Sequence, residues 1–355
     1  MAIEQQLRSD LETSSVNLEI LEFREDGVDI VRSGELDQRI TSVYGDLEWS
    51  WDDFVLRVGG RRERVDRDTF IPANVNEEND GRTSSSTESN IFGASASYSL
   101  SNGITFLAGY STTVARPIVK ELLPFPQIDR ETGQTILGNP DLEESSITNA
   151  DFAITFPQRG AFSGQINLFH KRISNPILRF RSGSTIFIDS GEEGTIAGVE
   201  VEGRMQLPFG FTWDANFALI QGDLDFVSLQ DGASLSSSFP EQPSHIFNTS
   251  LNYKNEDYGL NANLALNVVS PFVEQLPINA GSPFLERQPA PQLDFSITKS
   301  FDLGETNLIF GFSVENLLSS DDLITFISDD EDFDGTTQLS IDRGRRFSFW
   351  GKAEF

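Results

Sequence analysis

The sequence contains no cysteine, and this absence excludes several kinds of site. Without cysteine there is no disulfide, no thiolate metal site, no iron–sulfur cluster and no cysteine nucleophile. Histidine is almost as scarce, because only His170 and His245 occur in the 355 residues. A histidine-rich metal centre is therefore excluded as well, and we interpret both histidines as surface or interfacial side chains.

Positive charge is also in short supply. The chain has 26 Lys and Arg against 55 Asp and Glu, which gives a formal net charge of −29. A protein that binds nucleic acid generally needs a basic surface to neutralise phosphates. The sequence therefore predicts no nucleic-acid partner.

Long apolar runs and common catalytic motifs are missing too. No segment reaches the roughly 18–20 consecutive apolar residues of a transmembrane helix, and the N-terminus has no basic region followed by an apolar stretch, as a signal peptide would. Phosphate-binding loops, dinucleotide fingerprints and the motifs of zinc proteases and serine hydrolases do not occur. These absences predict no enzymatic activity and no cofactor.

The chain does contain a period-two alternation of apolar and polar residues along nearly its whole length. In one segment, apolar residues from Leu260 to Val268 alternate with Asn261, Asn263 and Asn267. About 13 such segments of about 9–14 residues follow one another. Ordinary strands average about five or six residues, whereas a tilted strand that spans a bilayer needs about 9–11. Polar residues in the middle of these segments indicate a face that meets water rather than a second packed sheet.

Short and long connections between these segments alternate. The short ones lie at about 50–52, 101–103, 157–160, 208–210, 255–257 and 302–304, and the long ones at about 67–89, 116–145, 173–193, 223–242, 270–290 and 317–342. Outer-membrane barrels have tight periplasmic turns and long external loops, whereas a sandwich or a propeller has no reason to keep this parity.

The predicted fold class is therefore all-β, an antiparallel up-and-down transmembrane β-barrel portion of about 13–14 meandering strands. We expect this portion to occupy residues 38–355 and residues 1–37 to form a weakly structured or strand-like lead-in. The last segment alternates Phe347, Phe349 and Phe355 with polar residues. A strand that ends on an aromatic residue is typical of the closing strand of a barrel.

Several motifs, in order along the chain, resemble the C-terminal barrel of the TonB-dependent outer-membrane receptors. The most specific is Gly138-Asn139-Pro140-Asp141-Leu142 followed by Asn149-Ala150-Asp151. The others are Ala115-Arg116-Pro117 with Glu121-Leu122, the segment 166–177, Gly198–Glu202, Phe247-Asn248, Leu293-Asp294, Glu315-Asn316-Leu317, and Gly344-Arg345-Arg346 with the terminal Phe355. The resemblance covers about residues 38–355.

The resemblance implies part of a barrel of about 22 strands in the outer membrane of a Gram-negative bacterium. Its implied partners are outer-membrane lipid, a small-molecule nutrient and the TonB complex, which powers import. The plug domain, the TonB box and the first barrel strands of the family have no counterpart in this sequence. We therefore expect a fragment that depends on a plug domain supplied elsewhere and cannot transport alone.

The segment 116–142 lies in a long, external connection by the parity of the loops. Arg116, Glu121, Asn139 and Asp141 are its candidate ligand-binding residues. The alternative is that the prolines and the Gly-Asn-Pro sequence of this segment only set turn geometry, and we favour this structural interpretation.

Two carboxylate groupings have both a functional and a structural interpretation. Asp329, Asp330, Asp332 and Asp334 are a weak calcium candidate on the last external connection, but their spacing fits an EF-hand poorly, and a solvated acidic loop is favoured. Glu200 and Glu202 share one face of a strand and are formally an acid–base pair. We favour the interpretation that they line a wet interior beside Arg204.

Three functions remain in competition. The first is the barrel portion of a TonB-dependent receptor, with ligand bound by the external loops and the lumen wall. The alternative is a passive outer-membrane porin or a structural barrel, and the second alternative is a soluble β-rich binding module. Siderophore, cobalamin and oligosaccharide remain equally open as substrates.

Overall fold

The computed structural model describes residues 2–25, 28–71, 81–123, 126–128, 133–304, 306–327 and 335–354. The side chains of 2–36, 69–71, 81–83 and 119 lie outside this description. Contacts divide the chain into two compact units. Unit 1 contains Met1–Tyr98, Ala108–Ala150 and Arg172–Glu192, and unit 2 contains Ser99–Leu107, Asp151–Lys171 and Glu193–Phe355.

Unit 1 is built on long antiparallel strands in chain order. The strands β1 to β4 pair successively, each with the next along the chain. Their bounds are β1 (Ala2–Glu25), β2 (Val28–Trp51), β3 (Phe54–Ile71) and β4 (Gly81–Ser99). Three further long strands have residues in both units, namely β5 (Thr105–Ala115), β8 (Ser145–Arg159) and β9 (Phe162–Ser174).

Unit 1 also contains short elements in its long connections, for which the sequence predicts no strand or helix. These are α1 (Val119–Leu122), β6 (Gln127–Ile128), β7 (Thr135–Leu137), β10 (Ile177–Ser182) and β11 (Thr185–Ser190). The four short strands pair in the order β10-β11-β7-β6. Leu122, Leu142, Ile186 and Ile188 form a buried cluster among these elements, so the connections of unit 1 have an apolar core of their own.

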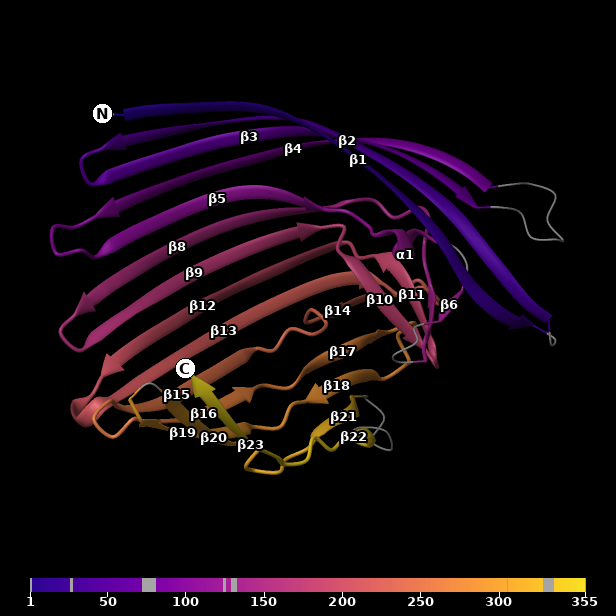
Figure 1. Ribbon diagram of the computed structural model, residues 1–355. Coiled ribbons are helices and arrows are strands. Elements are labelled where there is room, and N and C mark those ends of the chain that lie inside the picture. The colour runs from indigo at the N-terminus through magenta and orange to yellow at the C-terminus, as the bar shows by residue number, and fades with distance from the viewer. Residues whose placement is uncertain are drawn as a thin grey trace. The chain divides into compact units, whose positions relative to one another are not determined.

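Unit 2 has the same organisation. Its long strands pair antiparallel in the order β12-β13-β15-β16-β19-β20-β23 and lie side by side in Figure 1. Their bounds are β12 (Glu193–Gln206), β13 (Phe211–Val227), β15 (His245–Asn255), β16 (Leu260–Val269), β19 (Gln292–Asp302), β20 (Asn307–Glu315) and β23 (Arg346–Glu354), with a 3₁₀ turn, η1 (Pro208–Gly210), between the first two.

Short strands occupy the long connections of unit 2 as well. They are β14 (Ser234–Ser237), β17 (Phe272–Pro277), β18 (Phe284–Gln288), β21 (Asp322–Ile327) and β22 (Thr337–Ile341). β14 pairs with the end of β13, and the other four pair in the order β17-β18-β21-β22. Leu224 and Phe226 near the end of β13, Leu276 in β17 and Leu285 in β18 are buried.

The short connections are tight because each contains a residue with positive φ. Gly210 illustrates the requirement: its φ is +83°, and a Cβ atom there would lie 2.2 Å from the carbonyl oxygen of Lys254. Only glycine adopts this conformation so close to another backbone without strain. The turn therefore fixes the register of β12 against β13, in which Arg204 lies opposite Asp214.

Alternation gives the long strands of unit 2 two different faces. On the apolar face, Trp213, Leu251, Leu264 and Phe295 lie opposite one another on successive strands. Leu264 remains 41% exposed, as expected of a side chain that has no second protein layer against it. Asn216, Asn248 and Asn267 lie opposite one another on the other face, which we call the polar face.

The predicted all-β, antiparallel up-and-down fold class is confirmed. The division into a lead-in over residues 1–37 and a barrel portion over 38–355 stays a prediction, although β1 and the first part of β2 occupy most of the lead-in. Within the described ranges, no helix is long and apolar enough to cross a membrane.

Candidate functional site

The polar face of unit 2 carries rows of amide side chains. The Asn248 Nδ2 donates to Asn216 Oδ1 at 2.8 Å, and Asn267 Nδ2 donates to Asn248 Oδ1 at 2.5 Å. In a second row, Asn263 Nδ2 donates to Asn252 Oδ1 at 2.7 Å. Cross-strand pairs of this kind order a sheet surface, so these amides form a fixed array of donors and acceptors.

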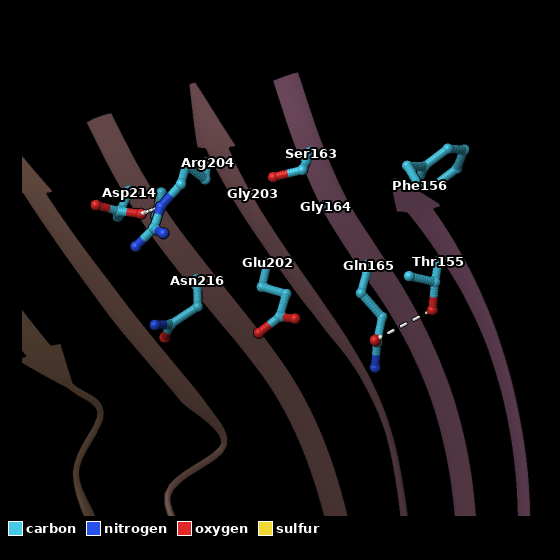
Figure 2. Close-up of a pocket in the computed structure, with 11 residues that line it drawn as sticks. Thr155, Phe156, Ser163, Gly164, Gln165, Glu202, Gly203, Arg204, Asp214 and Asn216 are labelled. Atoms are coloured by element: carbon cyan, nitrogen blue, oxygen red, sulfur yellow. Dashed lines mark hydrogen bonds and ion pairs between the residues drawn. The ribbon is translucent and has the colours of Figure 1, made fainter. Parts of the chain in front are cut away.

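A hollow of about 380 Å³ lies on this face over β8, β9, β12 and β13 (Figure 2). Arg204 Nε donates to Asp214 Oδ1 at 2.6 Å on one side of the hollow. Thr155 Oγ1 donates to Gln165 Oε1 at 3.3 Å on the other side. The hollow is lined by Thr155, Phe156, Ser163, Gly164, Gln165, Glu202, Gly203, Arg204, Asp214, Ala215 and Asn216.

Two further hollows continue the first along the same face. One of about 260 Å³ shares Gln165, Glu202 and Asn216 with it and adds Glu200. The other, of about 170 Å³, shares Asp214 and Asn216 and extends to Asn267 and Asp294 among others. The polar face of unit 2 is therefore hollowed from β8 to β19.

The chemistry of these hollows is that of a surface for hydrated, hydrogen-bonding solutes. The Glu200 carboxylate accepts a bond from Asn167 Nδ2 at 3.1 Å, and Asp214 accepts one from Asn252 Nδ2 at 3.0 Å in addition to the bond from Arg204. Within the described part of the chain, no side chain pairs with the Glu202 carboxylate. Hydrogen-bond donors and acceptors that are fixed in this way can replace part of the water around a polar solute.

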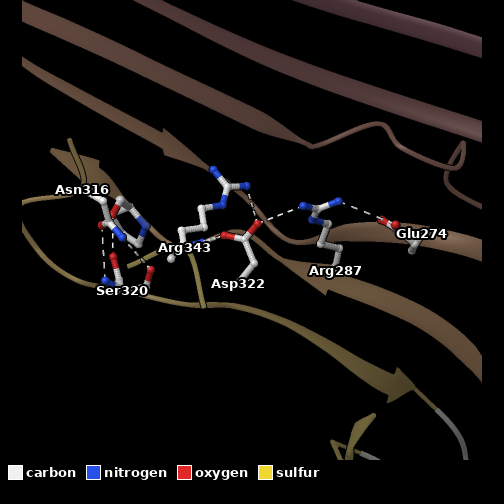
Figure 3. Close-up of polar contacts among 8 residues, drawn as sticks. Glu274, Arg287, Asn316, Ser320, Asp322 and Arg343 are labelled. Carbon is white, nitrogen blue, oxygen red and sulfur yellow. Dashed lines mark hydrogen bonds and ion pairs between the residues drawn. The ribbon is translucent and has the colours of Figure 1, made fainter. Parts of the chain in front are cut away.

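A second polar cluster, centred on Asp322, links the connections of unit 2 by ion pairs and hydrogen bonds (Figure 3). The side chain of Asp322 is 1% exposed and pairs with Arg287 at 3.0 Å and with Arg343 at 2.5 Å. Its other oxygen accepts a bond from the backbone N–H of Ala290 at 3.0 Å. One carboxylate therefore joins the connection between β16 and β19 to both ends of the connection between β20 and β23.

Asn316 supports the same junction. Its backbone N–H donates to Asp294 Oδ1 at 2.8 Å, and its Nδ2 donates to the carbonyl oxygens of Gly344 at 3.1 Å and Ser320 at 3.3 Å. Ser320 Oγ donates to the carbonyl oxygen of Pro291 at 2.8 Å. These bonds tie the ends of three long strands to the Asp322 cluster.

The two carboxylates that contact Arg287 have opposite pKa shifts. Burial acts to raise the pKa of Asp322, but hydrogen bonds from Ala290, Arg287 and Arg343 outweigh it and hold this pKa below its usual value. Burial raises the pKa of Glu274, and the attraction of Arg287 opposes that shift only in part. Glu274 lies 3.7 Å from Arg287, a distance too long for a strong hydrogen bond.

In unit 1, the predicted site residue Arg116 is the centre of another ionic cluster. Its side chain is 20% exposed and pairs with Glu63 at 2.5 Å and with Glu144 at 3.2 Å. Ser89 Oγ also donates to Glu144, and Arg61 pairs with Glu63. Arg116 thus joins the end of β5 to β3 and to the residues before β8.

The other predicted residues of this loop also make contacts within it. Glu121 Oε2 accepts a bond from the backbone N–H of Ile118 at 3.0 Å, at the start of α1. Asn139 Nδ2 donates to Asp189 Oδ1 at 3.0 Å, and Asn139 Oδ1 accepts a bond from the backbone N–H of Asp141 at 2.9 Å. Ligand binding by Arg116, Glu121, Asn139 and Asp141 stays a prediction.

The Gly-Arg-Arg motif and the aromatic residues of the last predicted segment, which we take as the barrel signature, lie at or near the last long strand. Gly344 has a φ of +57° and precedes the exposed Arg345, whereas Phe347 and Phe349 lie on the apolar face of β23. Phe355 lies outside the described residues, and so do the calcium candidates Asp329, Asp330, Asp332 and Asp334. In the part of the chain that the structure describes, no group of three or more His, Asp or Glu is arranged to hold a metal ion.

Most of this geometry leaves no pattern in the sequence. The opposition of Arg204 and Asp214 follows from a tight turn between two alternating segments, and that signal was available. Nothing in the sequence pointed to Asp322, because its partners Arg287 and Arg343 are 35 and 21 residues away along the chain.

Comparison with known proteins places this geometry in a family. Residues 15–317 match the family model described as TonB dependent receptor-like, β-barrel. No functionally curated protein matches the sequence. Among solved structures, the ferric yersiniabactin uptake receptor FyuA from Yersinia pestis is 15% identical with a TM-score of 0.67, over 99% of this chain and 54% of that chain.

Two other solved structures give the same result. The ferric citrate transporter FecA is 13% identical with a TM-score of 0.68, over 99% of this chain and 54% of that one. The ferric-catecholate import receptor Fiu from E. coli K12 is 13% identical with a TM-score of 0.64, over 99% of this chain and 51% of that one. At these identities the likeness shows the fold alone.

The chain spans about half the length of the solved structures it matches. The family consists of receptors and transporters of the Gram-negative outer membrane and not of enzymes. The family model covers most of the sequence, and its range includes the motifs from Arg116 to Leu317. The chain therefore belongs to the TonB dependent receptor-like β-barrel family.

Proposed function

We propose that this chain forms part of the wall of an outer-membrane receptor that takes up a small hydrophilic nutrient with energy from the TonB complex. The observation that carries the proposal is the two-faced sheet of unit 2. One face exposes large apolar side chains, and the other carries polar hollows over β8 to β19. A sheet with lipid on one side and a wet lumen on the other needs this division.

The nutrient passes along the polar face and is first bound by the external connections. In this arrangement the Asp322 and Arg116 clusters hold the connections in place, while Arg116, Glu121, Asn139 and Asp141 are the candidates for contact with the ligand. The plug domain is supplied by a segment outside this sequence. The chain alone therefore does not carry out energised uptake.

Membrane insertion of the apolar face is tested by a pair of substitutions on opposite faces of β16. We expect Leu264→Arg to prevent insertion, because an arginine in the middle of a lipid-facing row costs about 2–4 kcal/mol. Asn261→Arg, on the polar face of the same strand, should insert normally. Flotation of the refolded chain with lipid vesicles and heat-modifiable gel mobility measure both outcomes. Equal flotation of the two variants would contradict the assignment of the faces.

Energised uptake is tested in cells. A strain that depends on an outer-membrane receptor for a scarce nutrient is given the chain alone or the chain together with a plug-bearing receptor portion. We expect uptake only in the second case, and only when TonB is present. Growth on the chain alone, independent of TonB, would favour the passive porin, and a stable ion conductance of the chain alone in planar bilayers would support that alternative.

A further inference from the structure

Lys299 is out of place on the apolar face of unit 2. The paired stretches 211–219, 247–255, 260–268, 293–301, 308–314 and 347–353 each contribute alternate residues to this face. Among those residues Lys299 is the single charged side chain. A charge on a face that meets hydrocarbon is costly and marks a candidate functional position.

The Lys299 ammonium group is only partly satisfied by the protein. Its Nζ donates to the carbonyl oxygen of Tyr258 and lies 5.0 Å from the centroid of the Phe301 ring. No carboxylate of the described residues forms an ion pair with it, and this includes Asp257 in the adjacent turn. An ammonium group has three donors, so within the described residues two N–H donors of Lys299 have no acceptor and its charge has no counter-ion.

The position of Lys299 is at the rim of the apolar face, not at its centre. It lies opposite Leu260, the first residue of β16, and Tyr258 lies just before Leu260 in the turn between β15 and β16. The side chain of Tyr258 is 68% exposed, and Phe301 packs edge-to-face on the exposed Phe310 with ring centroids 6.1 Å apart. The cost of a charge falls near the membrane interface, and a long lysine side chain can extend its head group to that level.

We propose that Lys299, Tyr258 and Phe301 form a binding site for the phosphate headgroup of an anionic phospholipid. The phosphodiester supplies the missing counter-charge and accepts the two free N–H donors, while the exposed aromatic rings contact the acyl chains. A free phosphate ion has no apolar part that could contact the rings, whereas a phospholipid has acyl chains, so the lipid is the favoured occupant. The proposal rests on the proposed membrane location of the chain.

Binding of an anionic lipid at Lys299 is opposed by repulsion from the net negative charge of the chain. The chain carries a formal net charge of −29, which disfavours anionic lipids over most of its surface. A single lysine near a lipid surface changes the binding of an anionic lipid by about fivefold. We therefore expect a preference for anionic over neutral lipid that disappears when the Lys299 side chain is replaced.

The test uses the full 355-residue chain, refolded in detergent and mixed with phosphatidylglycerol or phosphatidylcholine of identical acyl chains. Bound lipid is counted by native mass spectrometry for the wild type, Lys299→Gln, Lys299→Arg and Lys352→Gln. Lys352 is the matched control, because it lies on the polar face of β23 and pairs with Glu354 at 2.5 Å. Flotation with neutral vesicles is measured on the same samples.

We expect the wild type, Lys299→Arg and Lys352→Gln to prefer phosphatidylglycerol about fivefold, and Lys299→Gln to bind both lipids equally while still floating with vesicles. A preference that survives in Lys299→Gln, or a wild type with no preference, would overturn the headgroup site and leave the membrane location intact. A wild type that does not float with vesicles would instead overturn the proposed function, and the headgroup site with it.

Discussion

The two units hold their connections together with ionic clusters of opposite design. In unit 1 one guanidinium, that of Arg116, lies between two carboxylates, Glu63 and Glu144. In unit 2 one carboxylate, that of Asp322, lies between two guanidinium groups, Arg287 and Arg343. Both clusters join segments that are far apart in the sequence.

The two clusters differ in the partners that the outer charges keep when the central residue is removed. Around Arg116, both carboxylates keep another partner, since Arg61 pairs with Glu63 and Ser89 donates to Glu144. Around Asp322, Arg343 has no other ion pair within the described ranges, and Arg287 keeps only the longer contact with Glu274. A buried charge without a partner is more costly than a missing bond, so the cluster of unit 2 depends more on its central residue.

The largest effect is expected for Asp322→Asn. The amide cannot neutralise two guanidinium groups, and removal of one partner from a buried ion pair costs about 3–5 kcal/mol. Since Arg343 is 45% exposed, we expect the lower end of this range. Chemical denaturation of the refolded chain in detergent, followed by tryptophan fluorescence, measures the change. The exposed neighbour Asp321 offers the control Asp321→Asn, and an equal loss in both variants would contradict the central role of Asp322.

A smaller effect is expected for Arg116→Gln. The remaining partners of Glu63 and Glu144 limit the loss to about 2 kcal/mol, the scale of a charged hydrogen bond. The same denaturation experiment applies, with Arg62→Gln as the control because Arg62 forms an exposed pair with Glu88. If Arg116→Gln proves more damaging than Asp322→Asn, the comparison between the two clusters is wrong.

The pH dependence of the stability of unit 2 should distinguish the contributions of Asp322 and Glu274. The lowered pKa of Asp322 means that its stabilisation is complete above the unfolded-state pKa and is lost as the pH falls through the folded-state pKa. The raised pKa of Glu274 has the opposite sign, so that stability is lost as the pH rises through the unfolded-state and then the folded-state pKa.

We therefore expect Glu274→Gln to leave the free energy of unfolding at pH 7 unchanged or slightly increased, and to remove the decline that accompanies the rise in pH through the unfolded-state and folded-state pKa of Glu274. Denaturation curves of the wild type and the variant between pH 3 and 8 measure this. A clear loss of stability at pH 7 would mean that the contact of Glu274 with Arg287 outweighs the cost of burial.

The smallest effect is expected in the hollow of the polar face. Arg204 is 63% exposed, and its partner Asp214 keeps the bond from Asn252. Exposed ion pairs contribute about 0–1 kcal/mol, so Arg204→Gln should change the unfolding free energy by less than about 1 kcal/mol. A larger loss would show that the Arg204–Asp214 pair holds the sheet together in the way the buried clusters do.

Much of the fold could be predicted because it depends on local pattern. The alternation at Leu260–Val268 identified a strand with two different faces, and the tight turns around Gly103, Gly210 and Gly304 marked the ends of hairpins. The long connection expected at about 67–89 was less accurate, because β3 extends to Ile71 and β4 begins at Gly81. Pairing with a neighbouring strand can prolong a strand where the side chains give no signal.

The candidate site was less accessible to sequence reasoning. Arg116 and Asn139 were identified by motif, but their partners Glu63 and Asp189 are 53 and 50 residues away. The strands β10, β11, β17, β18, β21 and β22 were missed, because they are short and do not alternate clearly. Their stability comes from pairing with one another and from cores such as Phe180 and Leu276, which no local window contains.

The sequence by itself determined the strands, the two faces of the sheet and the parity of the connections, because side-chain alternation and turn chemistry act between near neighbours. Only the tertiary structure decided which charges meet, that Asp322 is buried between two arginines, and that Lys299 has no carboxylate partner among the described residues. The physical reason is that these properties depend on burial and register between segments that are distant along the chain. A carboxylate or ammonium group contributes little to stability or binding in water, but much more once the fold has removed it from water and fixed its partners.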